Sequence, residues 1–281
     1  MTIHYEKMPK QSSRSAANAI LPKSLTVRDP SVDRPVVALG EQHVEAVRFE
    51  THAHANFAQL LCCLSGVLEV ECGGERAIVP PGHALFIRPG EPHSVHVENR
   101  ARLRTLDLWP SASQLKDRQR CVIPMGDLLA ALVERACEMG TDDADITSHA
   151  RRVLDLILDE VAAASPLSLS LPRGRDPRVL KVTELLLRSP DDGRDLDELA
   201  RLAGASPRNF IRLFRRETGF TLKAYRRLAR VQRAIVLMAG GQTASSAGAS
   251  VGYLNQSTFT HAFREATGKT PRAKAPPEKS A

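Results

Sequence analysis

The chain has 281 residues, of which 42% are hydrophobic and 25% are charged, and its formal net charge at pH 7 is +7. This size and composition fit two modest soluble domains. The sequence has neither a long apolar run nor the apolar core of a signal peptide, and its five cysteines form no CxxC pair. These features argue against a membrane protein and against a secreted disulfide scaffold. They predict a cytoplasmic protein with reduced thiols and no membrane partner.

The positive charge is concentrated in the second half of the chain. Residues 173–281 contain 21 Lys and Arg against 10 Asp and Glu, a net charge of +11, whereas residues 1–172 contain 18 against 22, a net charge of −4. This asymmetry is typical of a basic module that binds a polyanion and is attached to a nearly neutral domain. The polyanion could be double-stranded DNA, bound specifically or non-specifically, or a membrane surface.

The first part of the chain predicts an arm followed by a barrel. Residues 1–40 carry no readable motif and are expected to form a flexible arm. Residues 41–110 alternate short β-prone segments with turn signals such as Pro81-Gly82. Regular short strands punctuated by glycine predict a small β-barrel or a double-sheet jelly roll.

Four side chains of the predicted barrel are candidate metal ligands: His52, His54, Gln59 and His93. His52 and His54 project to the same side of a strand because they are two residues apart. Three neutral imidazoles suit zinc, nickel, copper or iron, and the amide of Gln59 would add a weak oxygen ligand. A divalent metal is therefore a candidate cofactor; alternatively, the histidines satisfy buried hydrogen bonds without metal. The spacing resembles the two motifs of the cupin barrel, with Gln59 where many cupins carry Glu and Arg88 where Pro is usual.

Helical patterns follow the predicted barrel. Residues 111–164 are expected to form a helical bridge, and Pro, Ser and Gly then predict a linker over residues 165–177. The second helix of the bridge has an apolar seam at helical spacing, formed by Ile146, Val153, Leu156, Ile157 and Val161. This seam could pack against the barrel or pair with a second subunit, and both uses stay open.

Residues 178–275 predict an all-helical domain. Its first half contains two consecutive helices joined by a short turn. Asp195 and Glu198 form the capping-box start of one helix, and the side chain of Ser206 can cap the next helix, with Pro207 at its first position. With its phenylalanines facing inward, this second helix exposes residues suited to DNA: Arg208, Ile211, Arg212 and Arg215. Arginine pairs with guanine and an aliphatic side chain contacts the thymine methyl, so the first three suit base edges and the last suits a phosphate. The alternative is a solvated basic face.

The same helix pattern occurs twice. FIRLFRRETG at residues 210–219 returns as FTHAFREATG at residues 259–268, with five identical positions. Two phenylalanines four residues apart dock one face of a helix, and the final glycine suits a left-handed cap. The outer side of the second copy offers polar rather than cationic side chains: Gln256, Ser257, Thr258 and His261.

The segment between the copies predicts a rigid spacer. LKAYRRLARVQRAIVLM forms a helix of about seventeen residues and about 25 Å, which could hold two reading helices about 34 Å, one turn of DNA, apart. Gly248 lies early in the second unit, where a buried alanine would suit a helix better by about 1 kcal/mol. We therefore expect the second unit to be the less secure of the two.

The C-terminal half resembles the DNA-binding domain of AraC-type regulators, in which a long helix joins two helix-turn-helix motifs. The matching strings are LDELARLAGASPRNFIRLFRRETGFTLKAYRRLARVQRAIVLM and VGYLNQSTFTHAFREATGKTP. The resemblance implies base contacts from the outer residues of both copies: Arg208, Ile211, Arg212, Gln256, Ser257, Thr258 and His261. The segment RAKAPPEKSA, which ends in a tail at residues 276–281, lacks the Tyr-Arg that usually follows the Thr-Pro.

Together these elements predict an α+β two-domain fold, with an N-terminal cupin-like β-barrel (jelly roll) and helical bridge, then a C-terminal all-α double helix-turn-helix domain. This order resembles a subgroup of AraC-type regulators whose barrel binds a small effector or helps the chain dimerise. We expect a non-enzymatic, sequence-specific transcription regulator that forms a homodimer, with a small-molecule or metal effector and RNA polymerase as a further partner. Two alternatives remain: a non-specific basic DNA-binding protein, and a metal-dependent cupin enzyme with a DNA-binding appendage.

Overall fold

The computed structural model describes residues 5–6, 29–139 and 147–271. These residues divide into two compact units, one of which spans most of the chain up to Ser168 and the other most of the chain from Leu169 onward. Within the described ranges, no helix combines the length and the apolar character that a membrane span requires.

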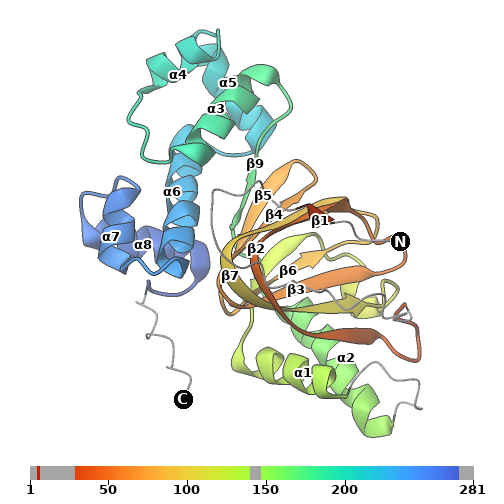
Figure 1. The fold of residues 1–281 in the computed structure, drawn as a ribbon. Coiled ribbons are helices and arrows are strands. Elements are labelled where there is room, and N and C mark those ends of the chain that lie inside the picture. The colour runs from red at the N-terminus through yellow and green to blue at the C-terminus, as the bar shows by residue number, and fades with distance from the viewer. Residues whose placement is uncertain (1–4, 7–28, 140–146, 272–281) are drawn as a thin grey trace. The chain divides into compact units, whose positions relative to one another are not determined.

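The first unit is a near-closed antiparallel β-barrel with helices at its end (Figure 1). Its strands are β1 (Tyr5–Glu6), β2 (Val36–His52), β3 (Ala58–Ser65), β4 (Leu68–Cys72), β5 (Glu75–Val79), β6 (His83–Ile87), β7 (His93–Leu108) and β8 (Cys121–Pro124). The spatial order β8-β6-β3-β7-β4-β5 places β7 in the middle, and β2 also pairs with β7. The predicted barrel is confirmed.

Two helices, α1 (Asp127–Glu138) and α2 (Ser148–Ala163), complete the core of the barrel after a short 3₁₀ turn at Ser113–Leu115. Leu129 and Val133 of α1 and Ile157 and Val161 of α2 belong to the same buried cluster as Leu60, Phe86 and Leu106 of the strands. Each buried aliphatic side chain contributes about 1.5–3 kcal/mol, so the helices stabilise the barrel rather than merely follow it.

The expected apolar seam of the second bridge helix therefore packs mainly against the barrel. Ile157 and Val161 are buried, Val153 is partly buried, and Leu156 stays exposed. Ile146 lies outside the described residues.

Three expected boundaries differ from the structure. β2 begins at Val36, inside the expected arm, because the apolar run Val36–Ala38 is buried against β7. β8 lies inside the expected bridge but pairs with β6 as part of the sheet. A short strand, β9 (Ser170–Pro172), occupies part of the expected linker.

The second unit is all-helical apart from β9, as predicted. Its helices are α3 (Pro177–Arg188), α4 (Leu196–Leu202), α5 (Pro207–Thr218), α6 (Leu222–Ala239), α7 (Ala244–Ser250) and α8 (Gln256–Thr267). The pairs α4–α5 and α7–α8 are the two helix-turn-helix units, and α6 is the spacer between them (Figure 1). With 18 residues, α6 is about 27 Å long.

Local signals set the ends of these helices. Asp195 and Glu198 form the predicted capping box, and Gly219 and Gly268 adopt left-handed conformations with φ of 75° and 73°. Ser206 is the N-terminal residue of α5 but makes no side-chain cap hydrogen bond, so that part of the expectation is wrong. Pro207 at the first helical position, with its fixed φ, starts α5 without it.

Gly248 has a packing role that the sequence did not reveal. A Cβ at this position would lie 3.0 Å from the ring of Phe259, closer than side-chain contacts allow without adjustment. Phe259 is fully buried and also contacts Tyr253 and Phe263. The glycine thus lets α7 lie close to the aromatic core of α8, a contact that opposes the helix-propensity cost expected from the sequence.

We expect Gly248→Ala to lower the free energy of unfolding by about 1–3 kcal/mol, because the added methyl overpacks the core against Phe259. Urea denaturation of the full chain measures this loss. Gly193→Ala is the matched control, since a Cβ at Gly193 meets nothing within 4 Å. Equal effects of the two substitutions would contradict the packing role.

Candidate functional site

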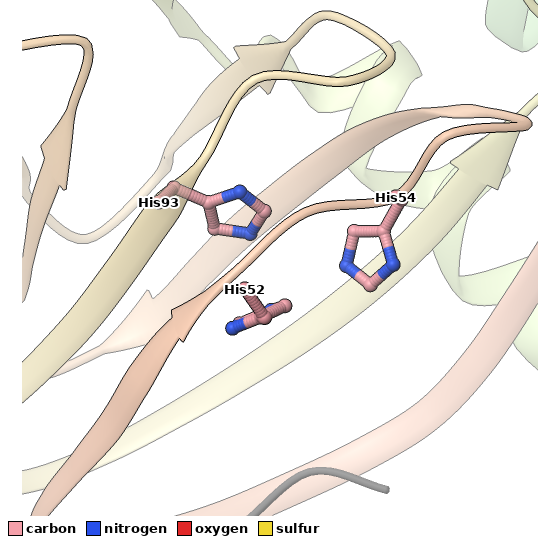
Figure 2. A group of neighbouring side chains, drawn as sticks. All are labelled: His52, His54 and His93. Carbon is pink, nitrogen blue, oxygen red and sulfur yellow. The ribbon is translucent and has the colours of Figure 1, made fainter. Parts of the chain in front are cut away.

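Three histidines converge in the barrel. His52 at the end of β2 is the cross-strand partner of His93 at the start of β7. His54 lies in the loop two residues after His52, so the expectation that both lie on one strand is wrong. The ring centroids of His52 and His93 lie 4.4 Å apart, and that of His54 lies 5.0 Å and 5.5 Å from them. One nitrogen from each ring lies within 4.8 Å of the others. Figure 2 shows the three side chains grouped together.

Backbone carbonyl groups orient two of these rings. His52 Nδ1 lies 2.8 Å from the carbonyl oxygen of Glu50, and His93 Nδ1 lies 3.0 Å from that of Glu91. A neutral imidazole that donates through Nδ1 keeps an unprotonated Nε2, the state in which it can bind a metal ion.

Burial keeps two rings of the cluster, His54 and His93, uncharged. It lowers the pKa of His54 and that of His93 to about 4, and the neighbouring histidines act on both in the same direction. At neutral pH these two rings are therefore neutral and offer lone pairs.

Gln59 lies among the histidines, as the sequence predicts. Its Oε1 is 3.2 Å from His93 Nε2, and its Nε2 is 3.1 Å from His54 Nε2. The Nε2 group also donates to Asp107 Oδ1 at 3.4 Å. The structure thus brings all four predicted residues together.

Asp107 is a member of the site that sequence reasoning missed. It is the direct cross-strand partner of Gln59 in the pairing of β3 with β7. Burial raises the pKa of its carboxyl to about 7, while the hydrogen bond from Gln59 opposes that rise. Asp107 could be predicted only from the register of β3 with β7, which a single sequence does not reveal.

Arg120 is a second missed residue, and it anchors the loop before His93. Its Nη1 donates to Glu91 Oε1 at 3.2 Å, and Glu91 Oε2 accepts from the backbone N–H of Arg88 at 3.3 Å. Because the carbonyl of Glu91 also orients His93, this clamp fixes the ring indirectly. The side chain of Arg88 donates to Gln119 instead of entering the site.

The donor set suits a cation. The Oε1 of Gln59 and the Nε2 of His93 are both hydrogen-bond acceptors when Nδ1 carries the proton, yet they lie 3.2 Å apart. In this tautomer a positive charge near the two atoms would offset the repulsion between their lone pairs, whereas in the other tautomer His93 Nε2 donates to Gln59 Oε1. The residues present therefore fit a divalent ion of the borderline class, for which imidazole nitrogen is a preferred ligand.

The outer faces of α5 and α8 form the second candidate site. On α5 the predicted residues are all exposed: Arg208, Ile211, Arg212 and Arg215. The 47% exposure of Ile211 leaves a large apolar side chain in solvent. The inner face carries Phe210, Leu213 and Phe214, all buried.

The predicted residues of α8, Gln256, Ser257, Thr258 and His261, are also exposed. The hydroxyl of Ser257 donates to the capping Asn255 at 2.6 Å, so its donor is already used. His261 lies 3.8 Å from Glu265, whose carboxylate also pairs with Arg227 of α6 at 2.7 Å. The second face is therefore less cationic than the first.

Comparisons with known proteins agree with this division of the chain. The model of the family described as "AraC-like ligand binding domain" matches residues 34–171, and that described as "Helix-turn-helix domain" matches residues 199–274. The HTH-type transcriptional regulator NimR of Escherichia coli K12 is 27% identical over 222 residues, which cover 78% of this chain and 80% of NimR.

Two further proteins are similar over part of the chain. The HTH-type transcriptional regulator RipA of Corynebacterium glutamicum is 36% identical over 101 residues, which cover 36% of this chain and 30% of RipA. A probable AraC family transcriptional regulator from Rhodopseudomonas palustris has a solved structure at 26% identity, with a TM-score of 0.32, that covers 34% of this chain and 91% of its own.

The matched families describe transcriptional regulators, a non-enzymatic class of proteins, and this excludes the cupin-enzyme alternative. The chain belongs to the AraC family of helix-turn-helix transcriptional regulators and carries an N-terminal, cupin-like AraC ligand-binding domain.

Proposed function

We propose that the chain reads two adjacent major grooves of double-stranded DNA in a sequence-specific manner, and that a small effector or divalent metal in the barrel alters this reading. The observation that supports the proposal most is the matched pair α5 and α8. Each buries two phenylalanines four residues apart and exposes the opposite face.

The first unit is the stronger reader in this proposal. Arg208 and Arg212 suit the O6 and N7 atoms of guanine, and Ile211 suits a thymine methyl. Arg215, one turn further along α5, suits a phosphate oxygen.

The second unit supplies weaker, polar contacts. Gln256 suits adenine, and Thr258, His261 and the acceptor lone pairs of Ser257 complete the set. Because Glu265 lies beside His261, a phosphate close to this ring is disfavoured.

In the barrel, we assign His52, His54, His93 and Gln59 as the residues that would hold a divalent ion. The ion would supply the positive charge that this cluster of lone pairs lacks. Since the ligands come from the end of β2, the following loop, β3 and the start of β7, binding would tie these segments together. A small organic effector that donates hydrogen bonds to the same atoms is the second candidate.

We further propose a cytoplasmic homodimer, with RNA polymerase as a downstream partner. Leu128 on α1 and Leu156 on α2 are large apolar side chains that remain exposed on the helix pair. Because the inner seam of α2 packs on the barrel, the dimer contact would use the outer faces of the helices.

Arg212→Ala should weaken binding to the duplex that the protein selects from a random library by about 10- to 100-fold, the effect of losing a bidentate contact of about 1–3 kcal/mol. Random duplexes should lose much less. Fluorescence anisotropy at fixed salt measures both affinities.

Arg215→Ala is the control for this experiment, because the loss of a phosphate contact weakens both duplexes alike and lowers the slope of log K against log salt by about 1. If Arg212→Ala also weakens both duplexes alike, α5 does not read bases and the non-specific alternative is favoured.

Untagged protein purified without chelator should contain about one divalent ion per chain, and His54→Ala should lose it, because each imidazole is one of few strong ligands. Elemental analysis by mass spectrometry gives the metal content. His43→Ala is the matched control, since His43 is exposed and pairs with Glu41 away from the cluster. Metal-free preparations of both the native chain and the control would favour an organic effector.

A further inference from the structure

We propose that Asp107 is a positioning residue of the barrel site, which holds the carboxamide of Gln59 so that Oε1, rather than the NH₂ group, faces His93. This inference rests on the proposed binding of a divalent ion. It adds to the site a residue whose own side chain need not touch the ion.

The strand pairing makes this contact rigid. Gln59 on β3 and Asp107 on β7 are directly opposite in the register, and the neighbouring pairs Leu60 with Leu106 and Leu61 with Thr105 keep the same register. Both Gln59 and Asp107 are 7% exposed, so water competes little for their hydrogen bond.

The chemistry of the two groups decides the orientation of the amide. An ionised carboxylate only accepts hydrogen bonds, whereas a carboxamide accepts at one end and donates at the other. In its ionised form Asp107 therefore selects the NH₂ end of Gln59, and Oε1 is left 3.2 Å from His93 Nε2. With the amide reversed, its N–H groups would face the ring nitrogen and repel a cation.

The same orientation protects the site when no ion is bound. The second hydrogen of the Gln59 amide is directed to His54 Nε2 at 3.1 Å. A bound ion would replace this single hydrogen bond, while the bond to Asp107 can stay in place.

Asp107 could also favour a cation simply through its negative charge, without orienting the amide of Gln59. A second carboxylate, Asp29, distinguishes these two explanations. Its carboxylate is close enough to His54 and Asp107 to influence the pKa of each, but it accepts its hydrogen bond from Asn56 at 2.7 Å. Asp29→Asn removes a nearby charge without touching the amide of Gln59.

The test measures Co²⁺ affinity of the metal-free full chain by competition with a chromophoric chelator at about pH 8, together with the visible spectrum of bound Co²⁺. Asp107→Asn should weaken binding by about 10- to 100-fold, as is usual for residues that orient metal ligands. It should also alter the Co²⁺ spectrum, because an asparagine can face Gln59 with either end of its amide and so no longer fixes Oε1 toward the ion. Asp29→Asn should change the affinity by less than about threefold.

The exchanged pair Gln59→Glu with Asp107→Asn should restore tight binding. The amide introduced on β7 would then donate to one oxygen of the carboxylate introduced on β3, and the other oxygen would face the histidines. The thermal stability of metal-free Asp107→Asn should not fall, since the variant replaces a buried carboxyl with a neutral group of similar size.

Three results would overturn the proposal in different ways. Equal losses in Asp107→Asn and Asp29→Asn would show that charge alone acts. Unchanged Co²⁺ affinity and spectrum in Asp107→Asn, with lower thermal stability, would show a structural role. Failure of the native chain to bind Co²⁺ would remove the metal site itself, and this inference with it.

Discussion

The barrel depends on the pairing of one long strand with three partners. β2 follows one edge of β7, while β3 and β4 share the other edge. This pairing places His93 opposite His52 and Asp107 opposite Gln59. Because successive side chains of a strand point to opposite faces, a shift of one residue would turn each of these groups to the wrong side of the sheet. The register of β7 therefore defines the sheet and the histidine cluster together.

The dependence of the site on the register of β7 limits how much of it the sequence predicts. The cupin-like spacing points to His52, His54 and His93, but a local pattern does not show that β2 ends at His52 and that His54 lies in the loop after it. Asp107 and Arg120 belong to the cluster only through pairings between distant segments, which no local pattern encodes. The same holds for β8, a strand of four residues whose partner lies far back in the chain.

The helices of the second unit are easier to predict from the sequence, because the signals that define them are local. The capping box at Asp195, the left-handed glycines and the repeated phenylalanines mark helix ends and inner faces within a few residues. The error at Ser206 and the unforeseen packing role of Gly248 both concern contacts in three dimensions. The first is a hydrogen bond that does not form, and the second is a close approach of α7 to the ring of Phe259. Likewise, only the packing shows that Ile157 and Val161 serve the barrel.

The division of α5 into two faces has an evolutionary consequence. Phe210, Leu213 and Phe214 dock the helix, whereas Arg208, Ile211 and Arg212 are exposed and absent from its buried core. Exposed substitutions away from such packing usually change stability by less than about 0.5 kcal/mol. Mutations can therefore accumulate on the outer face without unfolding the unit, so that descendants of this chain can acquire new binding preferences while keeping the same scaffold. On α8 this freedom is narrower, because Glu265 ties the outer face to α6 through Arg227.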